Sequence, residues 1–335
     1  MTAPLPGVSY IVTVYNKARY VEGVVRALTA QEGGFEREYV LVDDGSTDGS
    51  AEIAARLVAE IPRARLIRQE NRGPSVAVNR GLKETSMPFT HIVDGDDVVA
   101  PYGTRMLLEA ALASGCGAVY GRNDWYRSGS EPHFPEPPAQ VTVTPLNDTL
   151  YTVIRIGHAG GSTYIVDTAL FKRAGGCDER VFVQDHSISQ RMALVTKIGI
   201  VDHLVCMGPA DEPGRIMKNP AQLQHDQSLS ALLILRDHPE LAHRIRRLVQ
   251  KQVTGRAWKY AARHNGASVT SRFFWLFLAA RLPLVKLGDE MLQSTLAAFR
   301  RSDNVRLMPT AVAESVAGAS VGAPSALQSA ARNRP

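Results

Sequence analysis

Short apolar runs alternate with helix-like patterns along the first half of the chain. VSYIVTVY and EYVLVDD are typical of strands, and between them Tyr20, Val21, Val24, Val25 and Leu28 recur at helix spacing. Further strands are predicted in ARLIRQE, FTHIVDGDD and GAVYGR, with helical patterns at residues 53–58, 75–82 and 106–113. Strands alternating with helices at this spacing indicate βαβ units. We therefore expect an α/β fold, with a mainly parallel sheet and helices on both faces.

Polar residues gather where the predicted strands end. In parallel sheets flanked by helices, ligands bind at the carboxyl ends of the strands. The first four strands are followed in turn by Asn16, by Asp43 and Asp44, by Asn71, and by Asp94, Asp96 and Asp97. These residues are the first candidates for a binding site.

The stretch HIVDGDDVVAP places three carboxylates within four positions. Like charges this close repel each other, so gathering them is unfavourable for the fold unless a cation lies among them. A hard divalent cation, Mg²⁺ or Mn²⁺, takes oxygen ligands and often shares them with substrate phosphates. A solvated acidic turn and a calcium loop are the alternatives, although the calcium loop would need a distant acid that DGDDVVAPYGTR lacks. We expect a metal that bridges a diphosphate.

The acidic pair in VDDGSTDGS has two interpretations. Asp44 could accept a hydrogen bond from a nucleotide base or ribose, and Gly45 lets the chain turn close to a ligand. The alternative is a helix-capping turn, which suits Ser46 and Asp48. No G-x-G-x-x-G follows the first strand and no P-loop pattern occurs, so a dinucleotide site is not indicated.

The second half of the chain divides into three parts. A Pro-rich loop at 128–140 precedes a strand at 162–167 and helices at 169–175 and 185–198. Beyond a hinge near Pro213 and Gly214 the chain becomes helical and basic. We expect a catalytic domain at 1–215, a basic helical region at 216–300 and a low-complexity, disordered tail at 301–335.

The segment 241–288 holds ten Lys or Arg residues and no Asp or Glu. It also contains the aromatic-rich run FFWLFLAA. A basic helix with such an apolar flank can lie in a membrane interface and bind anionic lipids. The alternative is a helix pair packed on the catalytic domain with a solvated cationic face.

Composition indicates the cellular location of the protein and argues against nucleic acid as a partner. The chain has 335 residues with 44% hydrophobic residues, and its net charge of +5 is a mild basic bias that does not indicate nucleic-acid binding. The three cysteines lack metal spacing and fit idle thiols in a reducing compartment. We see no secretory signal, and the longest apolar run is too short to span a bilayer. We expect a cytoplasmic protein, with peripheral contact at the inner face of the plasma membrane as a further hypothesis.

Five segments together resemble the family 2 glycosyltransferases with the GT-A fold. They are VSYIVTVYNKARYV, YVLVDDGSTDGS, NRGPSVAVNRGL, HIVDGDD and VFVQDHSISQRM, in this order between residues 7 and 200. The resemblance implies inverting, metal-dependent transfer of a sugar from a nucleotide-diphosphate sugar to an acceptor hydroxyl. It implies Mn²⁺ or Mg²⁺ as cofactor, a glycan or lipid-linked glycan as acceptor, and a role in bacterial cell-surface polysaccharide synthesis.

The resemblance also assigns roles to residues. Asp97 becomes the first metal ligand, with Asp96 contacting either the metal or the ribose. The nucleotide sugar would be bound by Thr13, Tyr15, Asn16, Asp44, Asn71, Arg72, Asp94 and Asp96.

Asp185 matches the acidic residue that the family uses as general base. An inverting transfer needs one carboxylate to accept the proton of the attacking hydroxyl. A helix N-cap is the alternative role for Asp185 in VQDHSIS, and the two roles are compatible. We interpret His186 as a residue of the first helical turn, and His158 as either an acceptor contact or a core residue.

The chain departs from the family pattern in three places. Gln184 replaces an acid found in many relatives, and Val78 replaces an arginine, whose charge Arg72 or Arg80 could supply. No Trp follows Gln190-Arg191, which argues for addition of a single sugar rather than processive synthesis. Arg215 and Lys218 are further candidates for the diphosphate.

Two other functions are kept open. One is a sugar-nucleotide-binding or scaffold protein that has lost catalysis, which the departures at Gln184 and Val78 would fit. The other is a nucleotidyltransferase, although VYNKARY lacks the glycines of a triphosphate loop.

Overall fold

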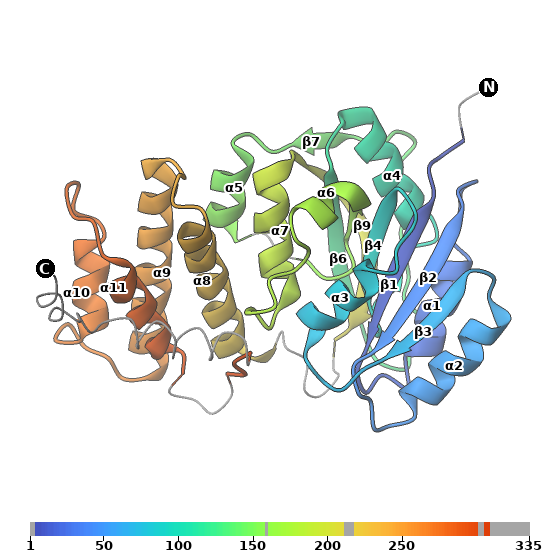
Figure 1. Cartoon of the computed structure of the whole chain (residues 1–335), viewed down its shortest axis with the longest axis horizontal. Helices are drawn as coiled ribbons and strands as arrows, with labels where there is room; N and C mark the ends of the chain where they lie inside the picture. The colour runs from blue at the N-terminus through green and yellow to red at the C-terminus, as the bar shows by residue number, and fades with distance from the viewer. Residues whose placement is uncertain (1–3, 158–159, 211–217, 301–304, 309–335) are drawn as a thin grey trace, which may run out of the picture.

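The computed structural model describes residues 4–157, 160–210, 218–300 and 305–308. The chain forms a nine-stranded sheet with the order β3-β2-β1-β4-β8-β6-β9-β5, and β7 pairs with β9. Figure 1 shows this sheet in the half of the molecule away from the C-terminal helices. The strands are β1 (Val8–Val14), β2 (Arg37–Asp43), β3 (Ala64–Arg68), β4 (Phe89–Asp94), β5 (Val98–Val99), β6 (Ala118–Tyr126), β7 (Val143–Pro145), β8 (Tyr164–Asp167) and β9 (Ile198–Pro209).

The pairing of the first four strands is parallel, as predicted. β1 lies between β2 and β4, and its register sets Thr13 opposite Asp94 and Val14 opposite Asp43. The carboxyl ends of these strands therefore meet at one edge of the sheet. β6 is not the neighbour of β4, because β8 lies between them and is antiparallel to both. The α/β fold is confirmed, with a mixed but mainly parallel sheet.

Helices cover both faces of this sheet. Side chains of a strand alternate between the two faces of the sheet. Tyr10 and Val12 of β1 therefore pack in one apolar cluster, together with α1 and α4. Ile11 packs in the cluster on the other face, together with α3, α6 and α7. The predicted apolar positions of the first helix are buried. The helices of this part are α1 (Val21–Thr29), α2 (Ser50–Glu60), α3 (Pro74–Leu82), α4 (Gly103–Ser114), α5 (Thr149–Ile156), α6 (Thr168–Arg173) and α7 (Gln184–Val195).

Four more helices form the end of the molecule opposite β3 (Figure 1). They enclose a third apolar cluster, to which α5 contributes Leu150 and Ile154. The helices are α8 (Pro220–Asp237), α9 (His243–His264), α10 (Arg272–Ala279) and α11 (Asp289–Gln293), followed by a 3-10 helix at Ser294–Ala298. None of the helices in the described residues is long and apolar enough to cross a membrane.

The segment 305–308 returns to the sheet domain. Met308 is buried there and packs with Val76, Phe182 and Val183. The expectation of a disordered tail is therefore wrong for these four residues, because composition gives no sign of the apolar pocket that receives Met308. The rest of the predicted tail lies outside the described residues.

Candidate active site

A cavity of about 720 Å³ opens at the carboxyl ends of β1, β2 and β4. It brings together nine of the ten residues that the sequence analysis selected for binding or catalysis. The tenth, Arg72, does not line it. The nine are Thr13, Tyr15, Asn16, Asp44, Asn71, Asp94, Asp96, Asp97 and Asp185.

The turn after β1 carries an exposed aromatic ring. Asn16 has a positive φ of 53° and accepts a hydrogen bond from the backbone N–H of Thr47 at 2.8 Å, which joins the turns after β1 and β2. Tyr15 is 42% exposed and lines the cavity. A half-exposed ring at the mouth of a polar cavity can stack on a planar base.

Asp44 holds the loop that follows β3. Its carboxylate accepts hydrogen bonds from the side-chain amide of Gln69 at 2.7 Å and from the backbone N–H groups of Arg72 and Gly73 at 2.9 and 2.8 Å. These bonds give Asp44 a structural role that the sequence did not suggest. Its predicted contact with the nucleotide stays a prediction.

Three carboxylates converge beside Gly161. A Cβ atom placed on Gly161 would lie 2.8 Å from Oδ2 of Asp94, 3.5 Å from Oδ2 of Asp185 and 3.6 Å from Oδ2 of Asp97. The backbone can approach this closely only because residue 161 has no side chain. Asp94 is the last residue of β4 and Asp97 lies in the turn after it, whereas Asp185 comes from the first turn of α7. The sequence motifs thus meet in space.

The carboxyl group of Asp185 is held in an environment that favours its neutral form. Burial, with the nearby Asp94 carboxylate as a second cause, raises the pKa of Asp185 from 3.8 to about 8. Its Oδ1 is buried and accepts no hydrogen bond within the described part of the chain. A cation or a donor hydroxyl brought next to this group would be favourable, which is the property expected of a working acid or base.

The carboxylate of Asp96 is engaged by a lysine of the cavity wall. It forms an ion pair with Lys17, with Nζ 2.6 Å from Oδ2. A carboxylate already neutralised by a lysine is a weaker candidate for a metal ligand. The predicted assignment of Asp97 and Asp96 to a metal ion stays a prediction.

Across the described ranges, no group of three or more His, Cys, Asp or Glu side chains is arranged to hold a metal ion. A cation in this cavity would therefore need oxygens from a ligand as well as from Asp94 or Asp97. Carboxylate oxygens shared with substrate phosphates are the ordinary coordination of Mg²⁺. The donor set fits a divalent ion that binds together with a diphosphate.

Asp185 is positioned by the start of α7. The helix is capped by Val183, whose N–H donates to Oδ2 of Asp226 at 2.8 Å, and it begins at Gln184. The N-cap interpretation of Asp185 is therefore wrong, because Asp185 lies within the first turn. Gln184 donates a hydrogen bond to Oδ1 of Asp94 at 3.1 Å, which links the helix to the acidic cluster.

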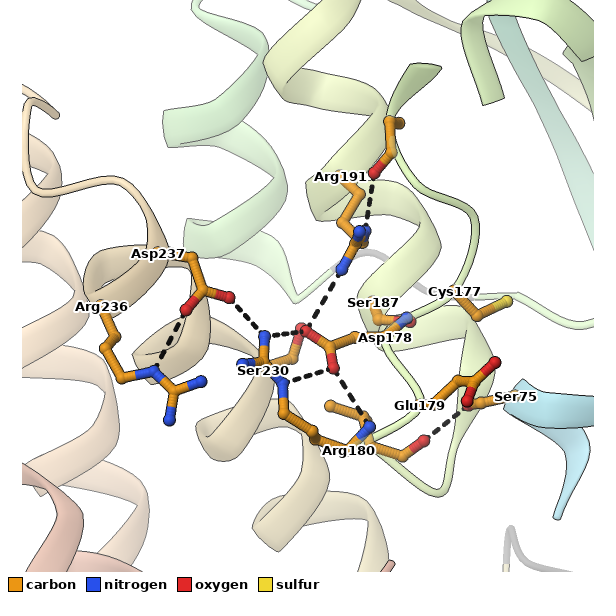
Figure 2. A network of polar contacts seen from close by, with 12 residues as sticks. Ser75, Cys177, Asp178, Glu179, Arg180, Ser187, Arg191, Ser230, Arg236 and Asp237 are labelled. Carbon is orange, nitrogen blue, oxygen red and sulfur yellow. Dashed lines mark hydrogen bonds and ion pairs between the residues drawn. The ribbon is translucent and has the colours of Figure 1, made fainter. Parts of the chain in front are cut away.

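A network of ion pairs anchors the loop before α7 (Figure 2). Asp178 accepts hydrogen bonds from Arg180 at 2.6 and 2.8 Å and pairs with Arg191 of α7 at 3.3 Å. Arg180 also pairs with Asp237 at the end of α8. The network ties the loop 178–183, and with it the start of α7, to the C-terminal helices.

Several cavity residues were not found from the sequence. Asn123, Trp125, Gln227 and Arg306 line the cavity, yet they come from segments without a recognisable motif. Phe182 also lines it and lies within VFVQDHSISQRM, but no role was predicted for it. Of the residues left open, His186 lines the cavity and is neutral, because burial lowers its pKa to about 4. Arg80 and Lys218 do not line the cavity, and His158 and Arg215 lie outside the described residues.

The family model for glycosyl transferase family 2 matches residues 9–172. Residues 9–172 form a glycosyl transferase family 2 domain. This domain runs from β1 to α6 and includes Thr13, Asp44 and the three acids after β4. Asp185 and the C-terminal helices lie beyond the matched residues.

Two bacterial relatives illustrate the likeness at the level of sequence. The uncharacterized glycosyltransferase YibD of Escherichia coli is 33% identical over 117 residues, covering 35% of this chain and 34% of YibD. The succinoglycan biosynthesis protein ExoO of Rhizobium meliloti is 36% identical over 112 residues, covering 33% and 31%. These matches span about a third of the relatives' length.

A solved structure shares the fold over most of the chain. Residues 1–349 of S. aureus TarS, crystallised with UDP-GlcNAc, match with a TM-score of 0.59 and 20% identity, covering 88% of this chain and 80% of that one. At this identity the likeness shows the fold alone. The likeness extends the GT-A-like architecture beyond the residues of the family model.

Proposed function

We propose that this protein is an inverting glycosyltransferase that moves one sugar from a nucleotide-diphosphate sugar to a hydroxyl group of a glycan or lipid-linked glycan. The observation that carries the proposal is the convergence of Asp94, Asp97 and Asp185 in one cavity of a family 2 domain. The complex of TarS with UDP-GlcNAc supports the class of donor, and the part of ExoO in succinoglycan biosynthesis supports a role in surface polysaccharide synthesis.

Asp185 acts as the general base in this proposal. The acceptor oxygen forms a bond to the anomeric carbon, the bond from that carbon to the diphosphate breaks, and the hydroxyl proton passes to the carboxylate of Asp185. The nucleoside diphosphate then leaves. Burial of Asp185 suits this role, because a carboxylate with a raised pKa is a stronger base near neutral pH.

The other cavity residues hold the donor. Tyr15 and Thr13, which line the cavity, would contact the nucleotide base, and Asp97 with Asp94 would hold Mn²⁺ or Mg²⁺. A bound ion of this kind would neutralise charge that develops on the leaving diphosphate. Gln184 keeps Asp94 oriented through its hydrogen bond, so loss of the family's acid at this position does not leave Asp94 unsupported.

The test is a panel of UDP-, dTDP- and GDP-sugars with Mn²⁺, scored by release of the nucleoside diphosphate. We expect one donor to be turned over by the wild type, and Asp185→Asn to lower kcat about 10²–10⁴-fold while donor still binds. Asp202→Asn, at an exposed ion pair with Arg122, is the matched control. Addition of EDTA should abolish turnover.

A wild type that binds a donor without turning it over would favour the rival function, a sugar-nucleotide-binding protein without catalysis. Binding of no nucleoside diphosphate in any metal would overturn the proposal altogether.

A peripheral contact with an anionic membrane is a second part of the proposal. Trp275, Leu278, Leu282 and Leu284 are exposed on α10 and the turn after it, and Leu284 is 96% exposed. Arg272, Arg281 and Lys286 lie in the same stretch, and within the described ranges none of them forms an ion pair. Exposed apolar groups among unpaired cations fit an interface that carries negative lipid headgroups. The cytoplasmic location stays a prediction.

A further inference from the structure

Two lysine or arginine side chains line the cavity within the described residues, Lys17 and Arg306. Lys17 is already paired with Asp96 at 2.6 Å. Arg306 forms no ion pair with any described carboxylate. The cavity is otherwise rich in carboxylates. Among the described residues that line it, Arg306 is therefore the basic side chain that is still available to a negatively charged ligand.

The backbone of Arg306 is fixed to the domain by Gln222 of α8. Its N–H donates to Oε1 of Gln222 at 2.6 Å, and Nε2 of Gln222 donates back to its carbonyl oxygen at 3.2 Å. Gln222 is buried and also donates to Asp226, which accepts the N–H of Val183 at the start of α7. One buried pair of side chains, Gln222 and Asp226, thus holds both Arg306 and the helix that carries Asp185.

The guanidinium group is oriented at the cavity wall. Its Nη2 donates to Oδ1 of Asn71 at 2.9 Å, and its central carbon lies 5.1 Å from the ring centroid of Phe182. Asn71 and Phe182 also line the cavity. A guanidinium has five N–H donors, and the contact with Asn71 takes one of them, so the group can still bind a phosphate through two N–H groups.

The cations expected from the sequence are less well placed. The side chain of Arg80 pairs with Glu84 at 2.7 Å, and neither Arg72 nor Lys218 lines the cavity. Arg306 is 235 positions away from Asn71 along the chain, so only folding brings the two together.

We propose that Arg306 is a binding residue for the diphosphate of the nucleotide donor. The proposal rests on the proposed function and names the residue that replaces the positive charge missing at Val78. Arg306 would contact the phosphate oxygens, while Asp97 and Asp94 would hold the metal ion that binds the same diphosphate. The ion pair of Arg306 with the diphosphate would strengthen as the bond to the sugar breaks, because negative charge builds up on the leaving diphosphate.

The experiment measures binding of UDP, GDP and dTDP with Mn²⁺ to the full chain by calorimetry, and of the matching nucleoside without phosphates. For the diphosphate that the wild type binds, we expect Arg306→Gln to raise the Kd about tenfold or more. Affinity for the nucleoside should change less than about twofold. Arg306→Lys should lie between wild type and Arg306→Gln, because it keeps the charge but not the paired N–H groups.

Arg63→Gln is the matched control, because Arg63 pairs with Glu36 outside the cavity. Its Kd and its melting temperature should equal those of the wild type. An unchanged diphosphate Kd in Arg306→Gln, or an equal loss for the nucleoside, overturns the role of Arg306 and leaves the proposed function intact. A wild type that binds no diphosphate overturns both.

Discussion

Asp185 shows how a single residue can be costly for the fold and useful for chemistry. Its carboxyl group is buried beside Asp94, and both facts raise its pKa, to about 8. A group with a raised pKa keeps its proton in the folded state, so this residue contributes less to stability as the pH rises from about 4 to 8. Such a cost is common at catalytic sites and rare in a purely structural core.

The pKa of Asp185 leads to a prediction about pH. The base must be ionised, so kcat/KM for the donor should rise with pH and level off above about 8. A cation bound beside the carboxylate lowers its pKa, so the corresponding rise in kcat should lie at lower pH. Initial rates from about pH 5.5 to 9 measure both profiles. A kcat/KM that is constant across this range would contradict the assignment of Asp185 as base.

At the scale of the elements, α7 is positioned from both of its ends and from the loop before it. Val183 is bound by Asp226 of α8, and Asp178 pairs with Arg191 one turn from the end of the helix. The C-terminal helices therefore help to set the place of Asp185, although they lie outside the matched family model. Displacement of a catalytic group by about 1 Å can cost about 10² in rate.

Arg180 links the loop to α8, and its removal should show this effect. We expect Arg180→Gln to lower kcat at least about fivefold while the Kd of the nucleoside diphosphate stays within about twofold, because the donor side of the cavity is untouched. Arg236→Gln is the control, since Arg236 also pairs with Asp237 but does not contact Asp178. Equal kinetics for both variants would show that the network does not position the base.

The exposed face of α10 carries a prediction of its own. The full chain should sediment with vesicles of phosphatidylglycerol, less with phosphatidylcholine alone, and less again at high salt, because screening weakens the attraction of cations to the surface. The double variant Trp275→Ser, Leu284→Ser should lose much of this binding and keep its melting temperature, since both side chains are exposed. Salt-independent sedimentation, or formation of a dimer through this face, would contradict the membrane contact.

At the scale of the whole molecule, the C-terminal helices and the sheet domain share an apolar core. Leu150 and Ile154 of α5 are buried against residues of α8 and α9, and Ala193 and Leu194 of α7 pack on the same cluster. The division at residue 215, drawn from composition, therefore cuts through a continuous core. A change of charge along the chain does not reveal where the buried surface ends.

A chain that stops at residue 215 should not fold on its own. Each large apolar side chain left exposed costs about 1.5–3 kcal/mol, and several such losses approach the whole stability of a domain, about 5–15 kcal/mol. We expect aggregation or loss of a cooperative melting transition, measured by scanning calorimetry and dye binding. A chain ending at residue 308 is the control, and a cooperative transition of the short chain at the control's melting temperature would contradict the shared core.

The sequence alone predicted the parallel strands, the edge of the sheet where the cavity opens and nine of the residues that line it. Apolar periodicity is a pattern among residues that are close along the chain, so it could predict the parallel strands. The polar residues that follow these strands then lie at one edge of the sheet, because the carboxyl ends of parallel strands meet there. Asp94 and Asp97 were recognisable because they lie three positions apart in one short acidic motif. The tertiary structure decided what depends on distant partners: the insertion of β8 beside β4, the approach of Gly161 that gathers three carboxylates, the pairing of Asp96 with Lys17, and the return of Arg306 to Asn71. These contacts join segments whose separation along the chain leaves no local pattern, because only the packed core brings them within hydrogen-bond distance.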